Sequence, residues 1–178
     1  MKLLIMCEGA NEKKIIDLLL ENDCLQFTED DLLDLNSFHA RQIVSNPQVR
    51  IALNTYPGEV TVIRIGDKQS DKLTIPIEYK DKIVEQRIYC TKPELEMLLI
   101  IAEGLEKEYE KVKGSVKPKQ FAKARVRLGK KMYDNSTQFY QDYFGADIDM
   151  LVNSIKEYQR VHGKAHSKDE HCLAELLK

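Results

Sequence analysis

The feature that most restricts the fold is an alternation of short apolar runs and amphipathic segments over the first 110 residues. Residues 2–7 (KLLIMC) form an apolar run that predicts a buried strand, and Glu8-Gly9 predicts a turn after it. Beyond the turn, apolar residues at positions 15, 16, 19 and 20 recur at the spacing of one helix face, and Asn11 is the predicted N-cap. The chain is therefore expected to open as a strand, a turn and a helix.

The same alternation continues along the chain. Further strands are predicted at residues 32–35, 59–66 and 86–90. Helices are predicted at residues 38–53, with a break near Asn46-Pro47, and at residues 91–110, 136–144, 148–161 and 168–177. Because strands that alternate with helices favour a mainly parallel sheet flanked by helices, we expect an α/β domain over residues 1–110. Residues 111–178 are expected to form a basic and helical C-terminal extension that packs on it.

The composition excludes several classes of protein. Of the 178 residues, 43% are hydrophobic and 31% are charged, which is typical of a globular chain with a substantial core. No apolar run approaches the roughly 18–20 residues of a membrane helix, and the apolar start is too short for a signal peptide, so we expect no membrane partner. The four cysteines lack CxxC spacing, which argues against a zinc knuckle or a disulfide framework and favours reduced thiols in the cytoplasm.

The charge is unevenly distributed along the chain. Residues 111–131 contain nine Lys or Arg and no Asp or Glu, so the rest of the chain carries a net charge of −11. Like charges without counter-charges repel one another, and a polyanion would relieve that repulsion with release of its counterions. The segment is therefore a candidate surface for DNA or RNA, although a basic helix face can also be simply solvated. The predicted contacts are Lys117, Lys119, Lys123, Arg125, Arg127 and Lys130.

Carboxylates follow three of the predicted strands. Glu8 follows the first strand, Asp67 follows the strand at residues 59–66, and Asp71 lies four residues later. Glu94 and Glu96 open the helix after residues 86–90. Ligands of a parallel sheet bind beyond the carboxyl ends of its strands, and carboxylates that meet there need a compensating charge, which Mg²⁺ or Mn²⁺ supplies through oxygen ligands. The alternative is that each acid only stabilises a turn or a helix start.

Two motifs carry a resemblance to a known family. Residues 2–22 (KLLIMCEGANEKKIIDLLLEN) resemble the first motif of Toprim domains, in which a hydrophobic strand is followed by Glu-Gly-x-Thr/Asp-Glu/Asp and a helix. A second strand that ends in Gly66-Asp67, then Asp71, a later strand and residues 92–96 (KPELE) are similar in order to the nuclease branches described as RloB-like and OLD-type. The resemblance covers about residues 1–105 and implies a Toprim-like fold.

The resemblance also implies functional residues. Glu8, Asp67 and Asp71 would be metal ligands and catalytic residues, Glu12 would be a possible additional ligand, and Glu96 would match the acid of the Pro-containing motif. OLD-type nucleases resemble this chain in having a late lysine, which implies a catalytic role for Lys168, or for Lys164, in neutralising charge on a phosphate. The same lysines would lie in an ordinary polar loop if that resemblance does not extend so far.

The expected function is that of a Mg²⁺- or Mn²⁺-dependent nucleic-acid phosphodiesterase of the Toprim type. Proteins of this kind are often encoded with an ATPase partner and act in bacterial defence against phage, which is implied by the resemblance alone. Many Toprim domains carry Asp-x-Asp, whereas the next acid here after Asp67 is Asp71. That departure leaves open a catalytically silent Toprim-like subunit that binds nucleic acid or a partner ATPase. A nucleotidyl-transfer activity at the same metal site is a third interpretation.

Overall fold

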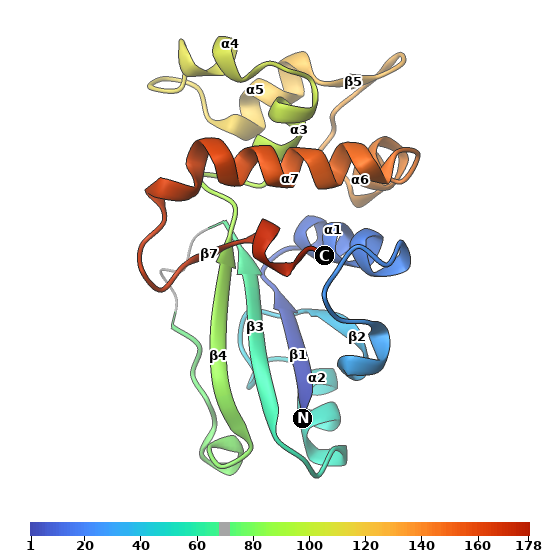
Figure 1. Cartoon of the computed structure of the whole chain (residues 1–178), viewed down its shortest axis with the longest axis vertical. Coiled ribbons are helices and arrows are strands. Elements are labelled where there is room, and N and C mark those ends of the chain that lie inside the picture. Colours follow the sequence, from blue (N-terminus) through green and yellow to red (C-terminus); the bar gives the residue numbers. More distant parts are fainter. Residues whose placement is uncertain (68–71) are drawn as a thin grey trace.

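The computed structural model describes residues 1–67 and 72–178. Its centre is a five-stranded sheet in the order β2-β1-β3-β4-β7, and every neighbouring pair is parallel (Figure 1). The strands are β1 (Lys2–Cys7), β2 (Leu32–His39), β3 (Val60–Gly66), β4 (Ile83–Cys90) and β7 (His171–Cys172). The predicted α/β class with a mainly parallel sheet is therefore confirmed, and the arrangement is consistent with a Toprim-like fold.

Helices cover both faces of the sheet and extend beyond its carboxyl ends. The helices are α1 (Ala10–Glu21), α2 (Pro47–Thr55), α3 (Met97–Ala102), α4 (Glu106–Glu110), α5 (Pro118–Arg125), α6 (Thr137–Phe144) and α7 (Ile148–His162). A short antiparallel hairpin joins β5 (Arg127–Leu128) to β6 (Lys131–Met132). Figure 1 shows α3, α4, α5 and this hairpin stacked beyond the arrowheads of β3 and β4, with α7 between them and the sheet. We call residues 97–132 the cap.

Two hydrophobic cores hold these layers together, and the alternation of side chains along the strands supplies both of them. In β3, Val60 and Val62 belong to the smaller core that is shared with α2, whereas Ile63 and Ile65 belong to the larger one. The larger core combines α1 and the cap with α6, α7 and the C-terminal residues. Residues from both predicted ranges, 1–110 and 111–178, thus pack in one core.

Three predicted helices differ from the structure. The first part of the helix predicted over residues 38–53 is wrong, because Phe38 pairs with Met6 in the register of β1 and β2; α2 begins at Pro47, at the predicted break. The helix expected over residues 91–110 begins at Met97 and is interrupted by Gly104, whose φ of 68° is easily reached only by glycine. Both differences arise where strand pairing or a turn takes the place of part of the helix that the apolar spacing indicated.

The helix predicted over residues 168–177 is wrong. Residues His171 and Cys172 form β7, which pairs with Tyr89 and Cys90 at the edge of β4, and a 3₁₀ turn follows at Leu173–Leu176. The free edge of β4 offers hydrogen-bond partners that no local sequence pattern reveals. The C-terminal segment therefore completes the sheet.

The part of the chain that the structure describes contains no helix both long and apolar enough to cross a membrane.

Candidate functional site

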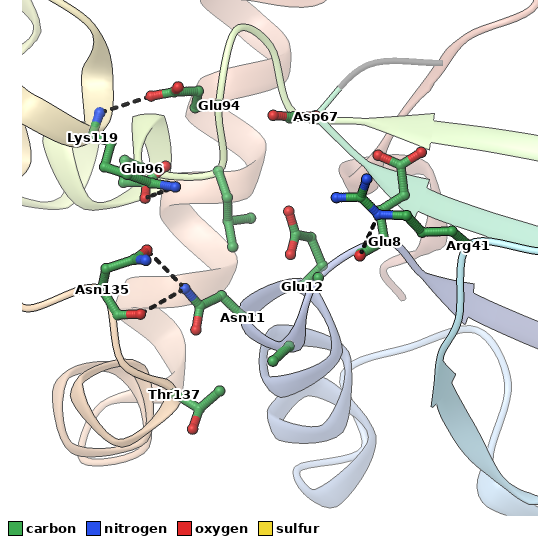
Figure 2. Close-up of a pocket in the computed structure, with 13 residues that line it drawn as sticks. Glu8, Asn11, Glu12, Arg41, Asp67, Glu94, Glu96, Lys119, Asn135 and Thr137 are labelled. Carbon is green, nitrogen blue, oxygen red and sulfur yellow. Dashed lines mark hydrogen bonds and ion pairs between the residues drawn. The ribbon is translucent and has the colours of Figure 1, made fainter. Parts of the chain in front are cut away.

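A polar cavity of about 350 Å³ lies where the carboxyl ends of the strands face the cap and the start of α6 (Figure 2). Parallel strands direct their last residues to this edge, so that the turns after β1 and β3 and the segment after β4 all reach it. The cavity is lined by Glu8, Gly9, Ala10, Asn11, Glu12, Arg41, Asp67, Glu94, Leu95, Glu96, Lys119, Asn135 and Thr137. Five of these residues are acidic.

The carboxylate of Glu8 lies over a glycine of the neighbouring strand. A Cβ atom on Gly66 would come within 2.3 Å of Oε2 of Glu8, so the absence of a side chain at position 66 creates the space that this carboxylate occupies. Oε1 of Glu8 pairs with Nη2 of the buried Arg64 at 3.4 Å. The side chain of Glu8 is therefore held by an ion pair with Arg64 of β3, and it also lines the cavity.

Glu12 lies in the first turn of α1, and its carboxylate rests against another glycine. A Cβ atom on Gly9 would meet Oε2 of Glu12 at 2.3 Å. Burial raises the pKa of Glu12, and the negative charges of Asp67, Glu96 and Glu8 raise it further, against the lowering effect of a backbone hydrogen bond. The acidic side chains thus repel one another across the cavity, and a cation placed among them would lower the free energy of their ionised forms.

Glu94 and Glu96 reach the cavity from the segment that leads into α3. The backbone N–H of Lys119 donates to Oε2 of Glu94 at 2.9 Å, and Nζ of Lys119 lies 3.7 Å from Oε1 of Glu96 (Figure 2). Glu96 is buried, and the hydroxyl of Tyr133 donates to the same Oε1 at 2.7 Å. Glu94 and Glu96 are therefore held by Lys119 of the basic segment, and Glu96 also by Tyr133, which follows that segment.

The residues that line the cavity but were not predicted as site residues include Asn11, Arg41 and Asn135. Nδ2 of Asn11 donates to Oδ1 of Asn135 at 3.2 Å, which ties the start of α1 to the segment before α6. The predicted role of Asn11 as the N-cap is wrong, because Gly9 occupies that position. Nε of Arg41 donates to the backbone oxygen of Glu8 at 3.3 Å. Arg41 lies two residues beyond the end of β2, so a correct prediction of the length of that strand would have placed it near this edge.

The structure brings together most of the predicted acids. Glu8, Glu12, Asp67 and Glu96 line the same cavity, whereas Asp71 lies outside the described residues. Lys164 and Lys168 are exposed in the segment between α7 and β7 and are not among the residues that line the cavity. The cations that do line it are the side chains of Lys119 and Arg41.

The predicted nucleic-acid contacts lie on α5, on the residue before it and on the β5–β6 hairpin, next to the part of the cavity lined by Lys119. Arg125 lies 3.9 Å from a carboxylate oxygen of Glu108. Within the described residues, four other cations of the set are exposed and form no ion pair, namely Lys117, Lys123, Arg127 and Lys130. This surface, which we call the basic surface, thus carries uncompensated positive charge beside an acidic cavity.

The described acidic side chains line the cavity, but three of them do not converge on one position. Among residues 1–67 and 72–178, no group of three or more His, Cys, Asp or Glu side chains is arranged so that it could hold a metal ion. Comparisons with protein-family models, with curated proteins and with solved structures found no match for the chain.

Proposed function

We propose that this chain is a Mg²⁺- or Mn²⁺-dependent phosphodiesterase that acts on nucleic acid, as the resemblance to Toprim domains implies. The observation that carries the proposal is that acids from three separate segments, residues 8–12, 67 and 94–96, line one cavity at the carboxyl ends of parallel strands. Acidic clusters at such a position are typical of sites for hard divalent cations.

The donor set fits such an ion in its chemistry. Carboxylate oxygens are the preferred ligands of Mg²⁺, and Gly9 and Gly66 leave room for the carboxylates of Glu12 and Glu8. Glu8 and Asp67 would hold the ion, with Glu12 and Glu96 as additional ligands. Because no three acids among the described residues already converge, some of these side chains would have to rotate into the cavity on binding. Asp71 stays a predicted ligand from the sequence.

The bound ion would lower the pKa of a water molecule and stabilise the charge that builds up on the phosphate. The chain itself would supply the placement of the substrate. Lys119 and Arg41 line the cavity and can neutralise a phosphate there, which makes them better placed than Lys164 or Lys168 for the role first assigned to a late lysine. The basic surface would hold the adjoining backbone of the nucleic acid.

Cleavage assays with labelled single- and double-stranded DNA and RNA in Mn²⁺ or Mg²⁺ test the proposal. Asp67→Asn is expected to abolish cleavage without lowering the melting temperature. Glu8→Gln should also abolish it, but that change removes a charge that faces buried Arg64, so it is the less clean variant. Asp81→Asn, a change at an exposed acid near the opposite end of β4, is the control. Cleavage that persists in both site variants would refute the proposal.

A second candidate function is that of a catalytically silent subunit that binds nucleic acid or a partner ATPase. It is favoured by the finding that, in the described part of the chain, the acids do not form a ready ion site. Binding of DNA or RNA with a steep salt dependence, together with no divalent-ion binding by calorimetry, would support this alternative over the enzyme. A role in anti-phage defence and a cytoplasmic location are proposed from the resemblance and the cysteine usage alone.

A further inference from the structure

Glu96 is the most deeply buried acid of the cavity. Its side chain is only 4% exposed, and a carboxylate in such a place needs hydrogen bonds to offset its loss of hydration. The described contacts of this carboxylate all go to one oxygen: Tyr133 donates to Oε1 at 2.7 Å, and Nζ of Lys119 lies 3.7 Å from the same atom. Within the described residues, Oε2 accepts no hydrogen bond. One oxygen is therefore fixed, and the other is left for a ligand in the cavity that Glu96 lines.

Tyr133 is itself held in place. Its hydroxyl lies 3.2 Å from that of Tyr140 and 3.1 Å from Oδ1 of Asn135. Tyr133 has a single hydroxyl proton, and the carboxylate is the nearest and most basic of these acceptors, so the proton points to Glu96 and Tyr140 donates to Tyr133. The ring of Tyr133 packs edge-on against Phe139 and Tyr140, at centroid distances of 5.2 and 5.8 Å. The donor to Glu96 thus belongs to a packed aromatic cluster formed with α6.

We propose that Tyr133, supported by Tyr140, is a positioning residue that orients Glu96 as a ligand of a divalent cation. The inference rests on the proposed function, because it assigns an ion to the same cavity. It adds that the site needs a residue from beyond the first 110. The carboxylate of Glu96 comes from the segment before α3, whereas Tyr133, which orients it, comes from the segment before α6. Hydrogen bonds of this kind to an ion's ligands typically contribute about 10–100-fold to its affinity.

The competing explanation is that Tyr133 only satisfies a buried acid. In that case its removal would lower stability but leave ion affinity unchanged. The chain offers a matched control in Tyr143, a buried residue of α6 whose hydroxyl donates to Oε1 of Glu103 at 2.6 Å. Tyr143→Phe removes a comparable hydrogen bond between a tyrosine and a carboxylate. Neither Tyr143 nor Glu103 lines the cavity.

The experiment measures the dissociation constant for Mn²⁺ by calorimetry, and the melting temperature without metal, for the full chain and its variants. Tyr133→Phe is expected to weaken Mn²⁺ binding by about tenfold or more, whereas Tyr143→Phe should bind Mn²⁺ like the wild type. Glu96→Gln should weaken binding at least as much as Tyr133→Phe. Adding Tyr133→Phe to Glu96→Gln should cause no further loss, because the tyrosine acts only through that carboxylate.

The outcomes separate the two proposals. If the wild type does not bind Mn²⁺, the proposed function fails, and this inference fails with it. If the wild type binds Mn²⁺ and Tyr133→Phe binds equally well, or if Tyr143→Phe is weakened as much, only the positioning role is overturned. If Tyr133→Phe does not fold, Tyr140→Phe takes its place, since it keeps the bond to Glu96 and removes its support. A smaller loss of affinity in that variant supports the role, and unchanged affinity refutes it.

Discussion

Replacing Asp67 by asparagine should change stability in opposite directions with and without metal. Asp67 lines the acidic cavity, and its charge is one of the causes that raise the pKa of Glu12. In the metal-free protein the substitution removes a repulsion between carboxylates, so the melting temperature should stay equal or rise slightly. In Mn²⁺ the same substitution removes a ligand, so the variant should melt below the wild type.

The size of the effect follows from linkage. A ligand that binds only the folded state stabilises it by about 2.7 kcal/mol when its concentration is a hundred times the dissociation constant. For a chain of this length, about 1 kcal/mol corresponds to roughly 2–4 °C, so Mn²⁺ should raise the melting temperature of the wild type by about 5–11 °C. If Asp67→Asn weakens binding about a hundredfold, only about 0.4 kcal/mol remains at the same Mn²⁺ concentration. The shift should then fall below about 2 °C.

Differential scanning fluorimetry in a Mn²⁺ titration measures both curves. Asp81→Asn serves as the control, because it removes an exposed acid near the opposite end of β4 and should follow the wild-type curve. Two results would refute the reasoning. One is a wild-type melting temperature that does not respond to Mn²⁺, and the other is an Asp67→Asn variant that responds as strongly as the wild type.

Three further predictions follow from individual contacts. Gly66→Ala should weaken Mn²⁺ binding measured by calorimetry, because the new methyl group would overlap the side chain of Glu8 and displace its carboxylate, and unchanged affinity would count against a role for that acid. A hydrogen bond from Lys92 lowers the pKa of Glu170 from 4.5 to about 2, so its contribution is present above pH 4.5 and is lost as the pH falls towards 2. Because both side chains contact solvent, that contribution is about 1 kcal/mol, and urea unfolding of Glu170→Gln should show a correspondingly weaker loss of stability over this pH range. The basic surface is tested with a triple alanine variant of Lys123, Arg127 and Lys130. It should reduce the slope of log affinity for nucleic acid against log salt by about 2–3, whereas Lys80→Ala at the far end of the sheet should leave the slope unchanged.

The sequence predicted the opening of the fold and the position of its acids, because these depend on local patterns. An apolar run followed by Glu8-Gly9 is enough to place a carboxylate at the carboxyl end of a strand, and Gly66-Asp67 is enough for a second one. Parallel pairing then brings the two ends to the same edge, which is a general property of such sheets.

Local patterns failed at the C-terminal segment. Leu173, Leu176 and Leu177 recur at helical spacing and are buried, but the two residues before them extend the sheet beside β4. The spacing of apolar residues indicates that one face of a segment is buried. It does not indicate whether the edge of a strand is available to pair with the backbone of that segment.

Local sequence patterns are therefore enough to predict the α/β class and a set of acids at one edge of the sheet. The side chains that face those acids are known only from the folded chain: Lys119 and Arg41 line the cavity, and Tyr133 donates a hydrogen bond to Glu96. These neighbours come from segments separated along the chain by tens of residues, and only the packing of the cap and α6 against the sheet brings them within hydrogen-bond or ion-pair distance. The chemistry of a buried carboxylate depends on those neighbours, so it could not be predicted from position alone.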